Sequence, residues 1–231
     1  MLSALLFVFF VVVGYLSGSV CSAVIVSRLF NLPDPRTKGS KNPGATNVLR
    51  LAGKKYAAVV LLADMLKGLF PVLFAQLLGA SSNAVTFTCL AAVMGHIFPV
   101  FFDFKGGKGI ATTIGVLLGL QLILGIAFAA TWLLIANFFR YSSLASIISI
   151  ILMPFYAIVI THNVAILTPL SLMMLFILYQ HRDNFTRLID GTEPKIKLHH
   201  HDLGDITDEL FDIKTKTKTK TKTKTQHKAK K

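Results

Sequence analysis

The amino-acid sequence predicts an all-α integral membrane protein, built as a bundle of seven transmembrane helices. Of its 231 residues, 53% are hydrophobic and the mean hydropathy is +0.63, which is too apolar for an ordinary soluble domain. The apolar residues also form long runs, each close to or above the ~20 residues that cross a bilayer. These runs cover residues 2–29, 56–79, 84–102, 110–139, 142–160 and 164–180.

The charge of the connecting segments predicts the orientation. Lysine and arginine gather after the first, third and fourth runs and in the C-terminal tail, whereas the connections near 80–83 and 161–163 contain neither. If run 110–139 holds two short spans that turn between Gly119 and Gly125, every basic segment lies on one side, which the positive-inside rule makes cytoplasmic. We therefore expect the N-terminus outside and the C-terminus in the cytoplasm. A single long span would instead place Arg140 and the tail outside.

The chain divides into a membrane domain, residues 1–197, and a polar cytoplasmic tail, residues 198–231. The first apolar run lacks a basic n-region and is too long for a signal peptide, so we expect it to remain as the first span. The tail alternates lysine and threonine, and we expect it to be disordered and drawn to anionic lipid rather than to nucleic acid. Its histidines at 199–201 lack further ligands, and Cys21 and Cys89 lie in apolar runs, so no metal site is expected.

Three ionisable residues interrupt the apolar runs. Asp64 and Lys67 lie three residues apart on one helix face, and His96 comes shortly before a glycine-rich segment. Charged side chains inside a span usually face the bundle interior or a cavity. The Asp64–Lys67 pair is therefore either a structural ion pair or part of a site, and His96 is either a packing residue or a functional group.

A basic, glycine-rich turn follows the third run, with the sequence Lys105-Gly106-Gly107-Lys108-Gly109. Its glycines let several N–H groups converge, a helix that begins near Gly109 adds its positive dipole end, and the lysines add full charges. The pattern favours a bound anion, most naturally a phosphate. It is not the nucleotide P-loop, because Gly109 stands where that motif needs serine or threonine. The alternative is a basic loop that only sets the membrane orientation.

Three further polar segments are expected on the same side of the membrane. Residues 31–54 are rich in Pro, Gly, Ser and Asn, which predicts a structured turn and then a helix that begins near Ala45. Residues 140–146 begin a helix with Ser142 or Ser143 as N-cap. Residues 181–193 either close over a cavity or lie on the membrane surface.

These segments resemble, in order and spacing, the motifs of the bacterial acyl-phosphate:glycerol-3-phosphate acyltransferases. The matching motifs are Gly39-Ser40-x-Asn42-x-Gly44-Ala45-Thr46-Asn47-x₂-Arg50, Gly95-His96-x₂-Pro99-x₂-Phe102-x-Phe104-Lys105-Gly106-Gly107-Lys108-Gly109-x-Ala111-Thr112 and His181-x₂-Asn184-x₂-Arg187-Leu188-x₂-Gly191-x-Glu193. The resemblance covers about residues 10–195 and departs at Lys41 and Pro43, where glycine and isoleucine are commonest in the family.

The resemblance implies the reaction. A fatty acyl phosphate gives its acyl group to the 1-hydroxyl of glycerol 3-phosphate, which forms lysophosphatidic acid and phosphate in the first acylation step of phospholipid synthesis. It further implies that no cofactor is used, and that the enzyme contacts membrane lipid in the bacterial cytoplasmic (inner) membrane with its active site facing the cytoplasm. A transient contact with the soluble enzyme that makes the acyl phosphate is also expected.

The resemblance also implies roles for the matching residues. The acyl-phosphate group is bound by Lys105, Gly106, Gly107, Lys108, Gly109 and Thr112. Glycerol 3-phosphate is bound by Ser40, Asn42, Asn47, Arg50, Lys108, Ser142 and His181. The catalytic set is Ser40, His96, Lys108 and Asn184, in which His96 positions groups or handles a proton. An acyl phosphate is already activated, so no protein nucleophile is needed, and either the substrate's own phosphate or a protein group takes the hydroxyl proton.

Two other classes of protein share some of these features. A phosphate or organic-phosphate transporter would also combine seven spans, charge within the membrane and broken helices around an anion site, but the sequence has no obvious inverted repeat. A membrane scaffold that binds lipid headgroups would need the basic loops and not the tight Gly-Gly-Lys-Gly turn.

Overall fold

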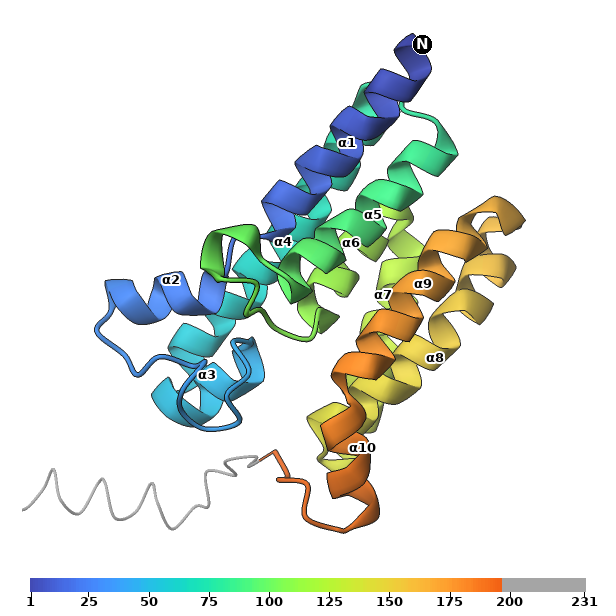
Figure 1. Cartoon of the computed structure of the whole chain (residues 1–231). Helices are drawn as coiled ribbons and strands as arrows, with labels where there is room; N and C mark the ends of the chain where they lie inside the picture. The colour runs from blue at the N-terminus through green and yellow to red at the C-terminus, as the bar shows by residue number, and fades with distance from the viewer. Residues whose placement is uncertain (197–231) are drawn as a thin grey trace, which may run out of the picture. The chain divides into compact units, whose positions relative to one another are not determined.

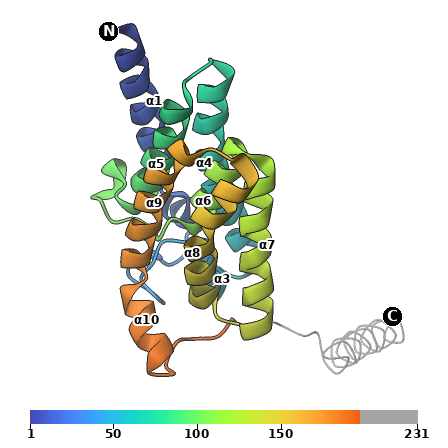
Figure 2. The same ribbon diagram turned by 90° about the vertical axis from the view of Figure 1, so that its right-hand side faces the viewer.

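The computed structural model describes residues 1–196, which form helices and turns with no β-strand in that range. The elements are α1 Leu2–Gly18, α2 Ser22–Leu29, α3 Ala45–Ala52, α4 Lys54–Leu77, α5 Ser82–Ile97, η1 Val100–Phe102, α6 Ile110–Leu120, α7 Leu122–Phe139, α8 Ser142–Thr161, η2 Val164–Ile166, α9 Leu167–Gln180 and α10 Arg182–Ile189. The long helices form one bundle, and the short helices α3 and α10 lie at the same end of it (Figure 1, Figure 2). The predicted tail, residues 198–231, lies outside the described residues.

Within the described residues, five segments are long and apolar enough to cross a membrane. They are Leu2–Leu29, Lys54–Leu77, Ser82–Phe102, Leu122–Phe139 and Ser142–Thr161. The segments Val164–Gln180 and Arg182–Ile189 make a sixth candidate, bent by 55° at the break. Helix α6 has 11 residues. At 1.5 Å per residue it extends roughly 16 Å, about half of the ~30 Å hydrocarbon core.

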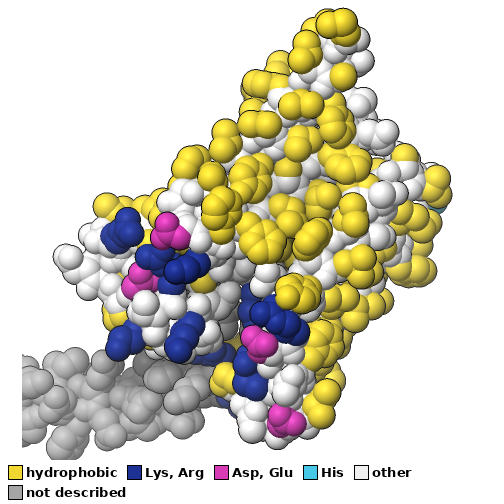
Figure 3. Space-filling model, in the orientation of Figure 1, with side chains coloured by type: hydrophobic (Ala, Val, Ile, Leu, Met, Phe, Trp, Pro, Cys, Tyr) yellow, Lys and Arg dark blue, Asp and Glu magenta, His cyan; other side chains and the backbone are white. Residues whose placement is uncertain are grey.

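The surface separates apolar from charged side chains. Figure 3 shows hydrophobic side chains over most of the visible face, while lysine, arginine and the acidic residues gather near one end of the bundle. Large side chains such as Phe70, Phe138 and Phe155 are 60%, 75% and 63% exposed. Apolar side chains displayed on this scale require a lipid environment, so the chain is a multi-pass membrane protein.

The expected turn within run 110–139 is present. Helix α6 ends at Leu120 and α7 begins at Leu122, with Gln121 between them in an extended conformation (φ −156°, ψ 118°). Helix α6 also packs closely on α4, because a Cβ atom at Gly115 would overlap the Met65 carbonyl. The apolar run is therefore two helices, the first of them short.

The first apolar run is also broken, which its continuous hydropathy does not predict. Helix α1 ends at Gly18 and α2 begins at Ser22, and the break frees the Val20 carbonyl to accept a hydrogen bond from Lys67 Nζ at 2.6 Å. Lys67 Nζ also lies 2.8 Å from Asp64 Oδ1, in an ion pair that is almost wholly buried. The structure thus contains the predicted Asp64–Lys67 pair, and the pair joins α4 to the break.

Two apolar clusters hold the polar end of the bundle in place. The larger one includes buried side chains from α1 and from α4 to α9, among them Phe10, Leu117 and Phe128. The smaller one joins α2, α3 and α4 through Ala23, Val48 and other small side chains. The predicted helix near Ala45 is present as α3, and this second cluster fixes it against α4, beside the cavity described next.

Candidate active site

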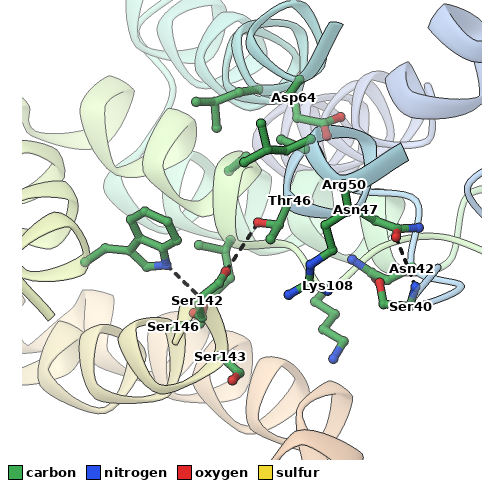
Figure 4. A pocket seen from close by; sticks show the side chains of 18 of the residues that line it. Ser40, Asn42, Thr46, Asn47, Arg50, Asp64, Lys108, Ser142, Ser143 and Ser146 are labelled. Atoms are coloured by element: carbon green, nitrogen blue, oxygen red, sulfur yellow. Dashed lines mark hydrogen bonds between the residues drawn. The ribbon is translucent and has the colours of Figure 1, made fainter. Parts of the chain in front are cut away.

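A cavity of about 1010 Å³ lies between α3 and α4 on one side and α7, α8 and α10 on the other. It contains the predicted residues Ser40, Asn42, Asn47, Arg50, His96, Lys108, Gly109, Ser142, His181 and Asn184 in its lining. Figure 4 shows Lys108 between the Ser40–Arg50 segment and the serines of α8. The other predicted residues, Lys105, Gly106, Gly107 and Thr112, do not line the cavity. Segments that are distant in the sequence therefore form one polar site.

Asn47 organises the loop that carries Ser40. Its side-chain oxygen accepts the Ser40 N–H at 3.0 Å, and its amide nitrogen donates to the carbonyls of Pro35 and Lys38 at 2.9 and 3.0 Å. These three bonds use both N–H groups of the buried amide. Asn47 therefore orders the turn that presents Ser40 to the cavity.

His96 supports the glycine-rich turn from behind. The Gly107 N–H donates to the His96 carbonyl at 3.1 Å, and a Cβ atom at Gly107 would overlap the His96 ring. The ring nitrogen Nδ1 lies 3.0 Å from Thr112 Oγ1 and 3.7 Å from Asp64 Oδ1. Gly109, which precedes the first residue of α6, has φ +89°, a conformation that favours glycine. These contacts fix the turn so that Lys108 and the N-terminus of α6 face the cavity.

Lys108 is connected to the C-terminal motif through Asn184. Lys108 Nζ donates to Asn184 Oδ1, and Asn184 Nδ2 donates to Glu193 Oε1 at 2.6 Å. Arg187 Nε donates to the other carboxylate oxygen of Glu193 at 2.7 Å. Within residues 1–196, Glu193 pairs with Arg187, and no carboxylate forms an ion pair with Lys108. The lysine charge is therefore hydrogen-bonded but not neutralised.

The electrostatics of this network follow from burial and charge. Burial, together with repulsion from the Arg187 guanidinium, lowers the pKa of Lys108 to about 8. Burial acts to raise the pKa of Glu193, but interactions with Ser143, Arg187 and Asn184 bring that pKa below its usual value. At neutral pH the site thus contains a carboxylate that is already bound and a lysine whose charge is available to an anion.

The mouth of the cavity is crossed by the residues that follow α10. Arg50 donates to the Pro194 carbonyl at 3.4 Å. The Ile196 N–H donates to the Arg140 carbonyl at 2.6 Å, and Arg140 Nε donates to the Ile196 carbonyl at 3.3 Å. Within residues 181–193, four side chains line the cavity, which agrees with the expectation that this segment closes over it: His181, Asn184, Arg187 and Glu193.

The remaining polar groups come from α8 and the start of α10. Ser142 Oγ lies 3.3 Å from Thr46 Oγ1 of α3, and the buried Ser143 lies beside the Glu193 carboxylate in the wall of the cavity. His181 Nδ1 lies 2.8 Å from the Ile177 carbonyl, so this nitrogen donates and leaves Nε2 as the acceptor of the neutral ring. Both helices therefore present hydroxyl or imidazole groups next to Lys108.

Several lining residues were not assigned to the site from the sequence, including Ser143, which was expected only as a possible N-cap, a position that Tyr141 occupies. They are Thr46, Trp132, Ser143, Ser146, Arg187 and Glu193. Glu193 and Arg187 belong to the third motif, and this is the sequence signal that could have identified them as site residues. Trp132 lies inside an apolar run, and no sequence pattern separates such a residue from its lipid-facing neighbours.

Comparison with known proteins gives one consistent result. The family model described as glycerol-3-phosphate acyltransferase matches residues 8–191. A glycerol-3-phosphate acyltransferase of Legionella pneumophila (strain Corby) is 60% identical over 195 residues, which covers 84% of this chain and 70% of the relative. The same enzyme of Coxiella burnetii (strain Dugway 5J108-111) is 47% identical over 192 residues, with coverage of 83% and 99%.

Solved structures agree with these relatives. A crystal structure of PlsY (YgiH), an integral membrane glycerol 3-phosphate acyltransferase, in its glycerol 3-phosphate form aligns with a TM-score of 0.79 and 40% identity. It covers 83% of this chain and 96% of that one. The lysophosphatidic acid form aligns with a TM-score of 0.77 and 38% identity, covering 83% of this chain and 95% of that one. At 40% and 38% identity, the chain is similar to these structures in its sequence as well as in its fold.

Proposed function

The chain belongs to the glycerol-3-phosphate acyltransferase family, and we propose that its cavity transfers a fatty acyl group from an acyl phosphate to the 1-hydroxyl of glycerol 3-phosphate. The products are lysophosphatidic acid and inorganic phosphate. One observation carries the proposal: Lys108, with no carboxylate paired to it in residues 1–196, lies in a cavity whose other end is apolar. Such a cavity accommodates a phosphate and a fatty chain together.

Glycerol 3-phosphate is bound at the polar end. Ser40, Arg50 and Lys108 hold its phosphate, and Asn42, Ser142 and His181 line the space around its hydroxyls. Arg50 is exposed and its hydrogen bond to the Pro194 carbonyl is long, so a doubly charged phosphate competes well for its guanidinium. Asn47 contributes through Ser40, because its amide is already used by backbone groups.

The acyl phosphate lies against the glycine-rich turn. Lys108 supplies charge, and the first N–H groups of α6, which have no partner inside the helix, point toward Gly109 and the cavity. Gly106, Gly107 and Thr112 act on the shape of the turn through their contacts with the His96 backbone and ring. The same N–H groups stabilise the negative charge that develops on the carbonyl oxygen during attack.

The chemical step needs no protein nucleophile. The 1-hydroxyl oxygen forms a bond to the acyl carbon, the bond from that carbon to the phosphate oxygen breaks, and its electron pair leaves with the phosphate. The hydroxyl proton passes to a phosphate oxygen of the donor. Lys108 balances the charge of the leaving phosphate, Asn184 orients Lys108, and His96 maintains the turn.

The same proposal includes the membrane arrangement. With α6 counted as a short span, the chain has seven spans, and the mouth of the cavity lies at the end where basic side chains gather (Figure 3). By the positive-inside rule that end faces the cytoplasm, which places the N-terminus outside. Both substrates then reach the site from the cytoplasmic side of the inner membrane, where the soluble enzyme that makes the acyl phosphate can deliver it.

The decisive experiment uses purified protein in detergent or lipid with palmitoyl phosphate and glycerol 3-phosphate. Phosphate release and lysophosphatidic acid formation are followed together, and we expect equal amounts of both, with neither formed when glycerol 3-phosphate is left out. Phosphate release without the lipid would indicate a hydrolase. Neither product from folded protein would favour the transporter, which is tested by uptake of radiolabelled glycerol 3-phosphate into vesicles.

A glycine substitution separates the enzyme from a headgroup-binding scaffold. Gly107→Val keeps every charge but places a side chain in the His96 ring, so an enzyme loses activity. A scaffold that needs only positive charge keeps its lipid binding. Gly53→Val is the control, since a Cβ atom there has nothing within 4 Å. Its φ of +85° adds a backbone cost that Gly107 does not have, so retained activity in this variant would assign the loss at Gly107 to the overlap with His96.

A further inference from the structure

The cavity continues from its polar mouth into an apolar section. Side chains of α4, α6 and α7 form this section, among them Leu61, Met65, Ile114, Ala129, Trp132 and Leu133. Leu61 and Leu133 line the cavity and are 42% and 62% exposed. The apolar section between α4 and α7 is therefore not filled by side chains, and a fatty chain can occupy it.

Trp132 stands where the polar and apolar sections meet. It is the one tryptophan of the chain, and its indole N–H donates to Ser146 Oγ at 3.0 Å. Ser146 Oγ in turn donates to the Ser142 carbonyl at 2.8 Å, and Ser142 faces Thr46 across the mouth (Figure 4). The hydrogen bond satisfies the only polar atom of the indole and fixes the ring in the wall of the cavity.

We propose that Trp132 is a specificity-determining residue, whose ring contacts the first methylene groups of the acyl chain and gives the enzyme its preference for long-chain over short-chain donors. The inference rests on the proposed function for the identity of the donor. It follows from the position of the donor phosphate and the position of the indole ring. The phosphate of the donor is fixed at Lys108, and the first apolar surface of α7 beyond the serines of α8 is the indole.

The expected size of the effect follows from apolar burial. Each methylene group taken out of water contributes about fourfold to binding. A ring that covers one side of two or three methylenes thus contributes on the order of tenfold. Acetyl phosphate has no methylene group to place against the ring and gains nothing from it, so loss of the ring lowers turnover of long donors selectively.

The kinetic test compares dodecanoyl phosphate with acetyl phosphate, which has no methylene group, at saturating glycerol 3-phosphate. In Trp132→Ala we expect the ratio of the two kcat/KM values to fall about tenfold, while KM for glycerol 3-phosphate changes less than twofold. Trp132→Phe keeps an aromatic wall and retains most of the preference. Leu134→Ala removes a side chain on the same helix that is exposed and does not line the cavity, and it leaves the ratio unchanged.

An equal loss for both donors, or an unchanged ratio, would overturn the proposal, because a merely structural role affects both chains alike. If Trp132→Ala does not fold, Trp132→Leu takes its place and is expected to lower the ratio by a smaller factor.

Fluorescence tests the contact independently of turnover. Because Trp132 is the sole tryptophan, emission of the wild-type protein reports on this wall alone. Hexadecanoyl lysophosphatidic acid is expected to shift the emission, whereas glycerol 3-phosphate is not. No shift at a saturating lipid concentration would contradict the contact. A shift in a protein that does not convert acyl phosphate would show that the donor is wrong while the chain-binding wall is right.

Discussion

Lys108 lines the cavity and Lys67 pairs with Asp64, which also lines it, but the two lysines have different surroundings. Lys67 is buried in α4, where Asp64 neutralises its charge at 2.8 Å and the Val20 carbonyl accepts a hydrogen bond. Lys108 is partly buried, and its hydrogen-bond partner is the neutral amide of Asn184. A buried charge must be compensated by a partner inside the protein or by a ligand. Lys67 therefore stabilises the fold, whereas Lys108 has a charge that can bind an anion.

The largest expected effect is on stability and concerns Lys67. Lys67→Met leaves the Asp64 carboxylate buried without its cation, and breaking such a pair costs about 3–5 kcal/mol. Thermal unfolding of the purified protein in detergent measures the loss. The double variant Asp64→Asn/Lys67→Met removes both charges, and we expect it to regain much of the stability. A single variant as stable as the wild type would contradict a structural role for the pair.

The next effect is on activity and concerns Lys108. Lys108→Ala removes the charge that balances the phosphates, and the loss of one such group lowers turnover by about 10²–10³-fold. The variant is expected to insert and unfold like the wild type, because no ion pair within residues 1–196 depends on Lys108. Near-normal turnover of the purified variant would remove Lys108 from the phosphate site. Ser40→Ala is expected to lose most activity in the same assay.

The surroundings of Lys108 also predict that the activity depends on pH. Its pKa is lowered to about 8, and only the protonated form attracts the phosphate. As pH rises through 8 the charge is lost, so kcat/KM for glycerol 3-phosphate should fall by about tenfold per pH unit above that value. Bound phosphate raises the pKa, and kcat should therefore fall at higher pH than kcat/KM. A kcat/KM that stays level up to pH 10 would argue against this account.

The smallest effect is expected at Lys105. This lysine belongs to the same basic turn, but it is exposed and does not line the cavity. Lys105→Ala should change turnover by no more than about twofold, since an exposed charge at a distance is screened by solvent and salt. A loss as large as that of Lys108→Ala would mean that the whole turn, and not one lysine, holds the phosphate.

The features of the fold that follow from composition and charge could be predicted from the sequence. The turn at Gln121 was expected because charge on the flanking connections required it, and helix α3 was expected from the loss of proline and glycine after Gly44. The break after Gly18 was not expected, because it is stabilised by Lys67, which is 47 residues away from its partner Val20 in the sequence.

The site likewise has features that the sequence predicted and features that it did not predict. Its motifs supplied Ser40, Arg50, Lys108 and His181, all of which line one cavity. The motifs did not show that Asn47 is committed to backbone carbonyls, or that Trp132 forms the wall behind the serines of α8. Those facts depend on which groups meet across helices, and a motif records only the order of residues along the chain.

The sequence by itself determined that this is a helical membrane protein of the acyltransferase family with basic, glycine-rich segments at one end, because hydropathy, charge and motif spacing are properties of the chain. Only the tertiary structure decided which lysine is neutralised and which remains available. Asp64 and Lys67 are neighbours on one helix, but the groups around Lys108 come from a segment about 80 residues further along the chain. Whether a charge is compensated depends on distances in space, and the folding of α10 against the glycine-rich turn sets those distances.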